Sequence, residues 1–274
     1  PLLTITHKEI DLIQTLKNAL LTLLFLIISP LTFAGETLSI TDQELMQVAD
    51  KIFMNEASGN PDKLITWNQG ENFPSLGIGH FIWYKAGEVE RFEETFPGLV
   101  TFLEQKGAKL PFILVRHKTA PWPNREHFLT NQNNASATAL KEFLYQTRDL
   151  QILYIFNRLQ AALPKMEAAS RSPQKVRDNF YAVANAKNGL YALIDYVNFK
   201  GEGTNPNERY KGQGWGLLQV LEGMPHLPQN ASTALTHFRE SSKARLSERV
   251  QNADPARNEN RWLQGWHNRC DTYR

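Results

Sequence analysis

The chain has 274 residues, of which 42% are hydrophobic and 21% are charged, and its formal net charge is +2. This composition is typical of a soluble globular protein with one large domain or two small ones. The charge excess is small and no dense Lys/Arg run occurs, so we do not expect a nucleic-acid partner. The single cysteine, Cys270, excludes an intramolecular disulfide and a multi-cysteine metal site.

The first 34 residues have the pattern of a secretory signal peptide. An uninterrupted apolar run, "ALLTLLFLII" (19–28), follows Lys8 and Lys17, and "LTFAGE" then offers small residues before a cleavage point after Ala34. The alternatives are a buried core helix or a retained anchor. We therefore expect a protein that is exported to the periplasm or the extracellular space, with no stable membrane insertion after cleavage.

The segment 38–60 carries the best-marked helix of the chain. Thr41 and Glu44 have the spacing of a capping box, and "SGNP" predicts the end of the helix around Gly59. An apolar stripe runs from Leu45 through residues 49 and 52 at helical spacing. The next step of four along this stripe reaches Glu56.

The helical period is lost between residues 60 and 95, where aromatic residues, glycines and β-branched residues predict a short sheet or hairpin. A short helix is expected at 97–107, and "APWPN" (120–124) is the expected boundary between two lobes. Further helices are expected over 136–147, 149–168, 174–186, 189–199, 213–223, 231–250 and 258–268. The predicted fold is mainly α (α+β), with one domain over 35–274, an N-terminal lobe over 35–120 and a helical lobe over 121–274.

Glu56 is the first candidate for chemistry. It lies one step beyond core residues and near the end of a helix, so burial and the negative end of the helix dipole would both disfavour its charged form. A carboxylic acid held in its neutral form can protonate the leaving oxygen of a glycosidic bond. The alternative is a solvated glutamate at a fraying helix end.

The stretch "FPSLGIGHFIW" (73–83) adds to the interpretation of Glu56. A helix that ends in Glu, then about twenty residues of irregular and β structure, and then Ser75-Leu76-Gly77-Ile78-Gly79-His80 resembles the phage-type lysozymes. In that family the motif is Thr-x-Gly-x-Gly-His on a hairpin, so Ser75 matches the Thr. The resemblance implies a lysozyme-like fold, a glycan-cleaving activity and Glu56 as the general acid.

The second carboxylate of the phage-type lysozymes is missing from its expected position. Six residues before Ser75 the chain has Gln69, which cannot ionise, and the nearest acid is Glu71. Without a second carboxylate, the goose-type lysozymes and lytic transglycosylases, which work with one Glu, become the better comparison. Glu71 and Ser75 remain candidates for placing the attacking water or stabilising the positive charge that develops on the sugar.

Two further segments resemble lysozyme relatives more weakly. "DYVNFKGEG" (195–203) is similar to the buried core helix that ends at the cleft wall, and "GQGWGLLQVL" (212–221) is similar to a cleft segment of lytic transglycosylases. Asp195 lies in an apolar helix and is either exposed or paired at the cleft, and His80 is expected to be a structural residue at the cleft edge. The candidates for substrate contact are Gln69, His80, Tyr196, Asn198, Gln213, Trp215 and Gln219.

Other kinds of site fit poorly. The motif at residues 77–80 lacks the residues of a phosphate loop or a dinucleotide fingerprint, and no metal-ligand spacing or nucleophile elbow occurs. We expect a monomeric enzyme without cofactor or metal, either a muramidase or a lytic transglycosylase, that cleaves β-1,4 bonds in peptidoglycan glycan strands. The alternatives are a non-catalytic peptidoglycan-binding protein on a lysozyme scaffold, or a chitinase or chitosanase.

Overall fold

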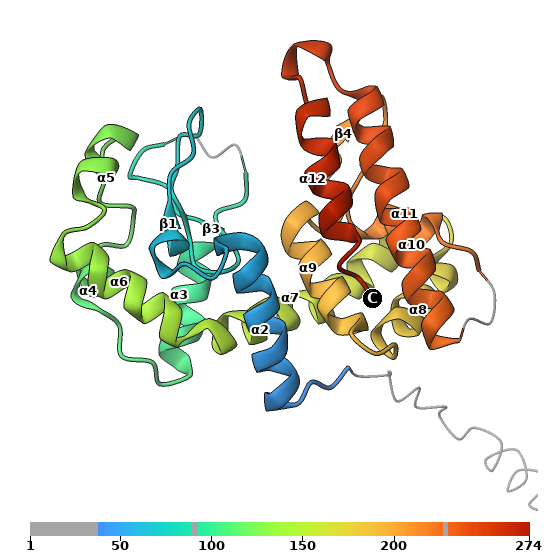
Figure 1. Ribbon diagram of the computed structural model, residues 1–274, viewed down its shortest axis with the longest axis horizontal. Coiled ribbons are helices and arrows are strands. Elements are labelled where there is room, and N and C mark those ends of the chain that lie inside the picture. Colours follow the sequence, from blue (N-terminus) through green and yellow to red (C-terminus); the bar gives the residue numbers. More distant parts are fainter. Residues whose placement is uncertain (1–37, 89–91, 227–229) are drawn as a thin grey trace, which may run out of the picture. The chain divides into compact units, whose positions relative to one another are not determined.

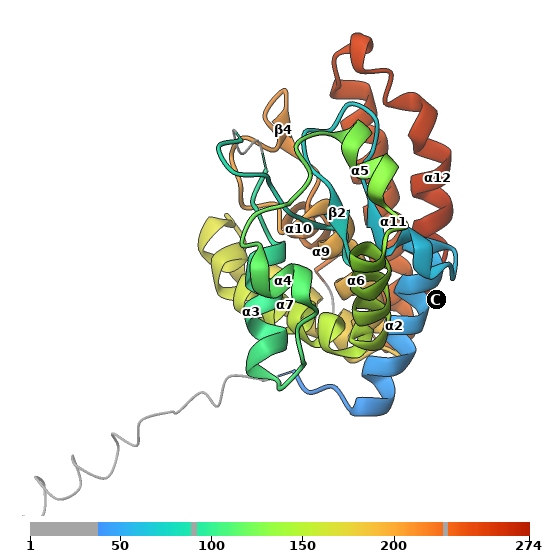
Figure 2. The ribbon, with the colours of Figure 1, turned by 90° about the vertical axis from the view of Figure 1, so that its left-hand side faces the viewer.

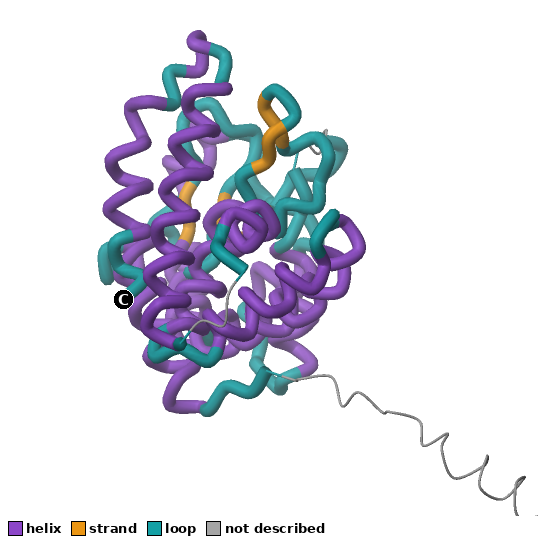
Figure 3. Tube along the Cα trace, turned by 90° about the vertical axis from the view of Figure 1, so that its right-hand side faces the viewer, coloured by secondary structure: helices purple, strands orange, loops and turns teal. Residues whose placement is uncertain are grey.

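The structure is a computed structural model that describes residues 38–88, 92–226 and 230–274. Helices dominate these residues, and the strands form two small antiparallel sheets (Figure 3), which confirms the mainly helical class. None of the helices in these ranges is long and apolar enough to cross a membrane. The predicted signal peptide, residues 1–34, lies outside the described residues.

Helix α2 (Asp42–Ala57) begins and ends close to where the sequence predicts. The Glu44 N–H donates to the Thr41 hydroxyl at 3.2 Å, and the Thr41 N–H donates to the Glu44 carboxylate at 2.9 Å, so the predicted capping box is present. Ser58 then takes a left-handed conformation, with φ of 53°, and ends the helix. The buried side chains of α2 include Leu45 and Ile52 on the predicted stripe.

A three-stranded sheet follows α2, as the loss of helical period predicts. After the 3-10 turn η1 (Pro61–Leu64), the strands β1 (Ile65–Thr66), β2 (Ser75–Leu76) and β3 (Phe81–Ile82) pair antiparallel in chain order. Leu76 lies opposite Ile65 on one side and opposite Phe81 on the other. Residues 77–80 therefore form the turn between β2 and β3, which we call the 77–80 turn.

Four helices lie with this sheet: α3 (Phe96–Gln105), α4 (Phe112–Arg116), α5 (Arg125–Asn131) and α6 (Ala135–Gln146). The ring of Trp67 contacts that of Phe128 at 6.0 Å between centroids, and Trp83 meets Trp122 at the same distance. The proline-rich passage 120–124 thus lies inside this group. The sequence pattern did not predict α4 and α5, which are only five and seven residues long.

The long helix α7 (Arg148–Ala169) runs from the sheet and its helices to a second, helical group (Figures 1 and 2). That group contains α8 (Pro173–Ala184), α9 (Gly189–Lys200), the hairpin of β4 (Arg209–Tyr210) and β5 (Gln213–Gly214), α10 (Leu217–Gly223), α11 (Ala231–Asn252), η2 (Pro255–Arg257) and α12 (Asn260–Cys270). The predicted helix over 213–223 is present but begins only at Leu217, because Lys211 and Gly212 have positive φ and turn the chain into β5 first.

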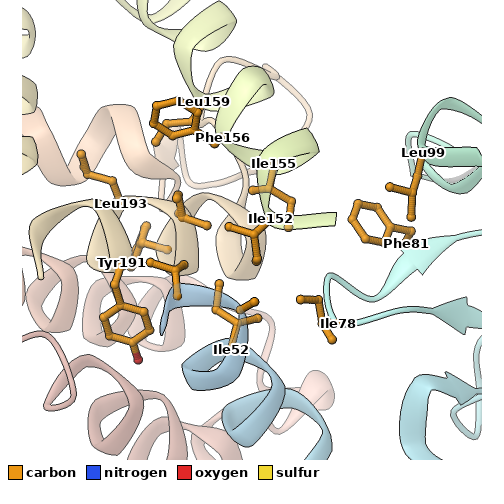
Figure 4. Packing of buried hydrophobic residues seen from close by; sticks show 14 of the residues in the cluster. Ile52, Ile78, Phe81, Leu99, Ile152, Ile155, Phe156, Leu159, Tyr191 and Leu193 are labelled. Atoms are coloured by element: carbon orange, nitrogen blue, oxygen red, sulfur yellow. The ribbon is translucent and has the colours of Figure 1, made fainter. Parts of the chain in front are cut away.

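A continuous apolar core joins these elements. Figure 4 shows Ile52 of α2, Ile78 of the 77–80 turn and Ile152 of α7 converging, and all three are fully buried. Residues 191–196 of α9 are buried all round, as the sequence predicts. This packing holds the end of α2, the turn and α9 close together, and thereby sets the position of Glu56.

Candidate active site

Glu56 lies in the last turn of α2, and 11% of its side chain is exposed. The preceding core residues Ile52 and Phe53 are buried, so the end of the helix is held firmly while the carboxylate itself remains within reach of solvent. The side chain is therefore not a solvated glutamate at a frayed end. It meets side chains from two other parts of the chain.

The first partner of Glu56 is Arg269, which comes from α12. The Arg269 Nη2 donates to Glu56 Oε1 at 2.5 Å. The same guanidinium donates through Nε and Nη2 to both carboxylate oxygens of Asp195, at 2.8 and 2.9 Å. Burial would lower the pKa of Arg269, but the two carboxylates outweigh it and hold that pKa well above its ordinary value. One guanidinium is thus shared by two carboxylates.

Asp195 is the buried end of this group. Its side chain is fully inaccessible, and besides Arg269 it accepts a hydrogen bond from the Tyr273 hydroxyl at 2.7 Å and a longer one from Asn55 at 3.5 Å. Of the two positions that the sequence left open for Asp195, the structure has the paired one. A buried carboxylate needs such partners, because leaving it unpaired would cost several kcal/mol (roughly 3–5).

The second partner of Glu56 is His80, from the 77–80 turn. The His80 Nδ1 lies 3.6 Å from Glu56 Oε2, which allows an ion pair when the imidazole is protonated. His80 has φ of 49°, a left-handed conformation that is uncommon for a residue with a side chain. Such strain persists only where the surrounding structure enforces it, and here it directs the imidazole to the carboxylate.

The 77–80 turn is held in place by backbone bonds and by one buried amide. The Gly77 N–H donates to the Leu64 carbonyl at 2.7 Å, and the Ile78 N–H donates to Gln151 Oε1 at 2.9 Å. Gly77 has φ of 72°, and a Cβ on it would collide with the Gln151 side chain. The glycines therefore serve a tightly packed hairpin, as the sequence predicts.

Glu71 lies in the loop between β1 and β2, close enough to His80 for electrostatic influence. Burial raises the pKa of Glu71, while a hydrogen bond from Asn68 and the charge of His80 act in the opposite direction. His80 thus interacts with Glu56 and with Glu71, the nearest acid to the expected second carboxylate. Gln69, in contrast, is exposed.

Two other predicted residues lie near the turn. Ser75 is in the central strand, opposite Thr66, and only 6% of it is exposed. Asn198 is on α9, and its Oδ1 lies 3.1 Å from the place that a Cβ on Gly79 would occupy. Asn198 therefore packs against the 77–80 turn, whereas Gln213 is exposed on the β4–β5 hairpin.

The predicted contact of substrate with Tyr196 and Gln219 is wrong for this structure. Tyr196 is fully buried, and its hydroxyl donates to the Trp215 carbonyl at 2.8 Å. Gln219 is 9% exposed; its Oε1 accepts from the Gly216 N–H and its Nε2 donates to the Gly203 carbonyl. Both side chains are occupied in holding the backbone. Trp215 is 8% exposed and covered by the Arg249 guanidinium at 4.2 Å.

Arg269 and Tyr273 are the members of the site that sequence reasoning missed. Asp195 in an apolar helix signals that a cation must be near, but the chain has 30 Lys and Arg residues, and no local pattern singles out Arg269. Its contact with Glu56 spans 213 positions of sequence.

Within the described ranges, no three His, Cys, Asp or Glu side chains come together as a metal site. No protein-family model, no curated protein and no solved structure matches the chain. The geometry around Glu56 is therefore the basis for a functional assignment.

Proposed function

We propose that the described unit has a lysozyme-like fold and that the protein is an exported enzyme that cleaves β-1,4 bonds in peptidoglycan glycan strands. The single observation that carries this proposal is the setting of Glu56. Its partly accessible carboxylate lies where α2, the 77–80 turn and α12 converge, between His80 and Arg269. A glutamate that closes the first helix and faces a Gly-x-Gly-His turn is the arrangement that the sequence motif implies.

The charges around Glu56 support a role in proton transfer. Arg269 supplies one positive charge to two carboxylates, so the group as a whole has a surplus of negative charge. Asp195 is fully buried and accepts hydrogen bonds from both Arg269 and Tyr273. Glu56 is the more accessible of the two carboxylates and has fewer donors, so it is the one that a substrate can approach to exchange a proton.

The chemistry then follows from one exchangeable proton. Glu56 donates it to the oxygen that bridges two sugars, the C1–O bond breaks, and the leaving alcohol keeps the proton while C1 becomes positively charged. The Glu56 carboxylate next removes a proton from a water molecule as its oxygen adds to C1, which restores the acid. If the 6-hydroxyl of the same sugar replaces the water, the product is an anhydro sugar.

Glu71 is the candidate for a second carboxylate. Its raised pKa and its electrostatic contact with His80 link it to the same site, and Ser75 lies in the adjacent strand. A carboxylate near C1 would stabilise positive charge or hold the attacking water. A catalytic role for Glu71 would therefore indicate a two-carboxylate mechanism, and the absence of such a role would indicate a mechanism with Glu56 alone.

Mass spectrometry of peptidoglycan digests tests the proposal. Glu56→Gln keeps the size and hydrogen-bonding groups of the side chain but removes its exchangeable proton, so release of soluble muropeptides should fall about 10²–10⁴-fold. Glu104→Gln, an exposed change at the end of α3, is the matched control. Glu71→Gln adds the second arm: a comparable loss indicates two carboxylates, and a loss below about tenfold indicates one.

Three results would contradict the proposal. The first is a Glu56→Gln protein that releases muropeptides at the parental rate. The second is a parental protein that binds purified sacculi and releases nothing, which would favour a glycan-binding protein. The third is cleavage of chitosan or chitin with peptidoglycan left intact, which would favour a different β-1,4-glycan as substrate.

A further inference from the structure

Lys200, the last residue of α9, has an unusual environment next to the candidate active site. Its ammonium lies 3.6 Å from the centroid of the Trp266 ring and 3.9 Å from that of Phe199. It forms no hydrogen bond and no ion pair with any residue that the structure describes. The side chain is partly exposed, so a ligand from solvent can reach it.

The charged groups around Lys200 are already paired with one another. Arg249 donates to both oxygens of Glu259, at 2.8 and 3.0 Å, and Arg257 donates to the same carboxylate at 3.3 Å. Arg269 is bonded to Glu56 and Asp195. Arg249 and Arg257 thus pair with Glu259, and Arg269 pairs with Glu56 and Asp195, so none of these ion pairs includes Lys200.

Burial and the positive charges of Arg249 and Arg269 hold the pKa of Lys200 well below its ordinary value. The surroundings of Lys200 therefore disfavour its charged form. The two aromatic faces offset this cost only in part, because a cation–π contact contributes about 0.5–2 kcal/mol. An anion bound at Lys200 would complete the pairing.

The position of Lys200 connects it to the proposed chemistry. The Phe199 ring contacts Lys200 and also the Arg269 guanidinium, whose carbon lies 4.2 Å from its centroid. Lys200 is thus one aromatic ring away from the residue that bonds Glu56. The neighbouring Trp262 ring is 42% exposed and stacks on Trp266 at 6.1 Å, so an apolar sugar face could rest beside the ammonium.

We propose that Lys200, with Trp266 and Phe199, forms a site for a carboxylate of the glycan substrate. This inference rests on the proposed function, and it deepens that function by naming the group that the enzyme recognises. A muramyl sugar without a peptide stem carries a carboxylate on its lactyl ether; where a stem is attached that carboxyl is an amide, and the stem carries carboxylates of its own. Chitin has none, so the site would favour muramyl glycans over neutral β-1,4-glycans.

Calorimetric titration without turnover tests the site. The full chain carries Glu56→Gln in every sample, and the ligands are chitotetraose and a stem-free tetrasaccharide with alternating muramic acid. Lys200→Met should weaken binding of the muramyl tetrasaccharide about tenfold, the effect expected for one charge-assisted hydrogen bond. Chitotetraose affinity should stay unchanged, and salt should weaken only the muramyl complex.

Two further variants keep the test decisive. Lys165→Met, at an exposed lysine on α7, is the matched control and should change neither affinity. Lys200→Gln repeats the loss of charge with a polar side chain, in case the Met variant misfolds. A muramyl tetrasaccharide with peptide stems, in which the lactyl carboxyl is an amide, identifies the source: a Lys200 effect with the stem-free ligand alone assigns the carboxylate to the lactyl group, and an effect with the stem-bearing ligand alone assigns it to the stem.

The two proposals fail in different ways. If Lys200→Met leaves the affinity for both muramyl ligands unchanged, the carboxylate site is overturned, even if Glu56→Gln abolishes cleavage. Conversely, a parental chain that cleaves no glycan but binds the muramyl ligand through Lys200 would overturn the proposed function and leave the site intact.

Discussion

Glu56 meets two regions of the molecule that are held in place by different forces. The 77–80 turn presents His80 through its backbone, with positive φ at Gly77 and His80 and a hydrogen bond from Ile78 to Gln151. Helix α12 presents Arg269 through charge, since its guanidinium is bonded to Asp195 at two points. The turn is specified by neighbours in sequence, whereas the charged side is assembled from α9, α12 and the residues that follow.

This contrast shows how one carboxylate can be held precisely yet remain reactive. The turn positions His80 through a strained backbone and through packing, with no ion pair needed to hold it in place. The positive charge comes from Arg269 on α12, and two hydrogen bonds of its guanidinium go to the fully buried Asp195. Glu56 is left with one short bond to Arg269 and a longer approach to His80, which keeps its second oxygen available.

The largest expected effect comes from breaking the charged side. Arg269→Met removes the guanidinium and leaves Asp195 as a buried carboxylate with two neutral donors. The free energy of unfolding should fall by about 3–5 kcal/mol, the usual cost of an unpaired buried charge. Urea denaturation measures this loss. Arg158→Met, which breaks a pair with the exposed Glu93 at 3.3 Å, is the control and should cost below about 1 kcal/mol. If the two variants lose equal stability, the buried position of Asp195 does not add to the cost of removing Arg269.

The next effect concerns the turn. Gly77→Ala forces a Cβ into a left-handed conformation, which costs about 1–2 kcal/mol, and also against the Gln151 side chain, which adds about 1–3 kcal/mol. Gly87→Ala is a close control, because Gly87 has φ of 74° with open space around it. The stability that Gly87→Ala loses should be limited to the cost of the left-handed conformation, because its Cβ meets no neighbouring atom. If thermal unfolding gives equal losses for both variants, the packing of the turn against α7 does not contribute.

The smallest effect is a gain of stability at Lys200. Lys200→Met should raise the free energy of unfolding at neutral pH, by about 1 kcal/mol, because it removes a poorly solvated charge. The pKa of Lys200 is lowered by burial, then by Arg249 and Arg269, while Glu259 and Cys270 act in the opposite direction. The folded state therefore loses this proton before the unfolded state does as pH rises.

The pH dependence of this gain gives a further check. The parental protein should recover stability relative to Lys200→Met as pH rises through the window between the lowered pKa and 10.5, because the folded state has then lost the proton that the unfolded state still binds. Melting curves of the two proteins across this window measure the difference. A gap that stays constant up to pH 11 would show that the gain comes from packing and not from charge.

Local patterns in the sequence predict much of the fold. The capping box at Thr41, the stripe that leads to Glu56 and the apolar surface of α9 each depend on residues within a few positions of one another. The same holds for the turn, because glycines on either side of Ile78 already indicate a tight hairpin. Such features follow from backbone sterics and hydrophobic periodicity, which act over short distances along the chain.

The partners of those residues depend on how the helices pack. Asp195 indicates from its sequence context that it must be exposed or paired, but only the approach of α12 to α9 identifies Arg269 and Tyr273 as its partners. Tyr196 and Gln219 show that solvent access is equally hard to predict from sequence. Both were expected to contact a sugar, and in the structure both side chains are buried. The side chains that carry chemistry are thus indicated by short-range pattern, while their charge partners and solvent access are decided by long-range packing. Burial and Coulomb interactions depend on distance in space, and the sequence specifies that distance only through the complete fold.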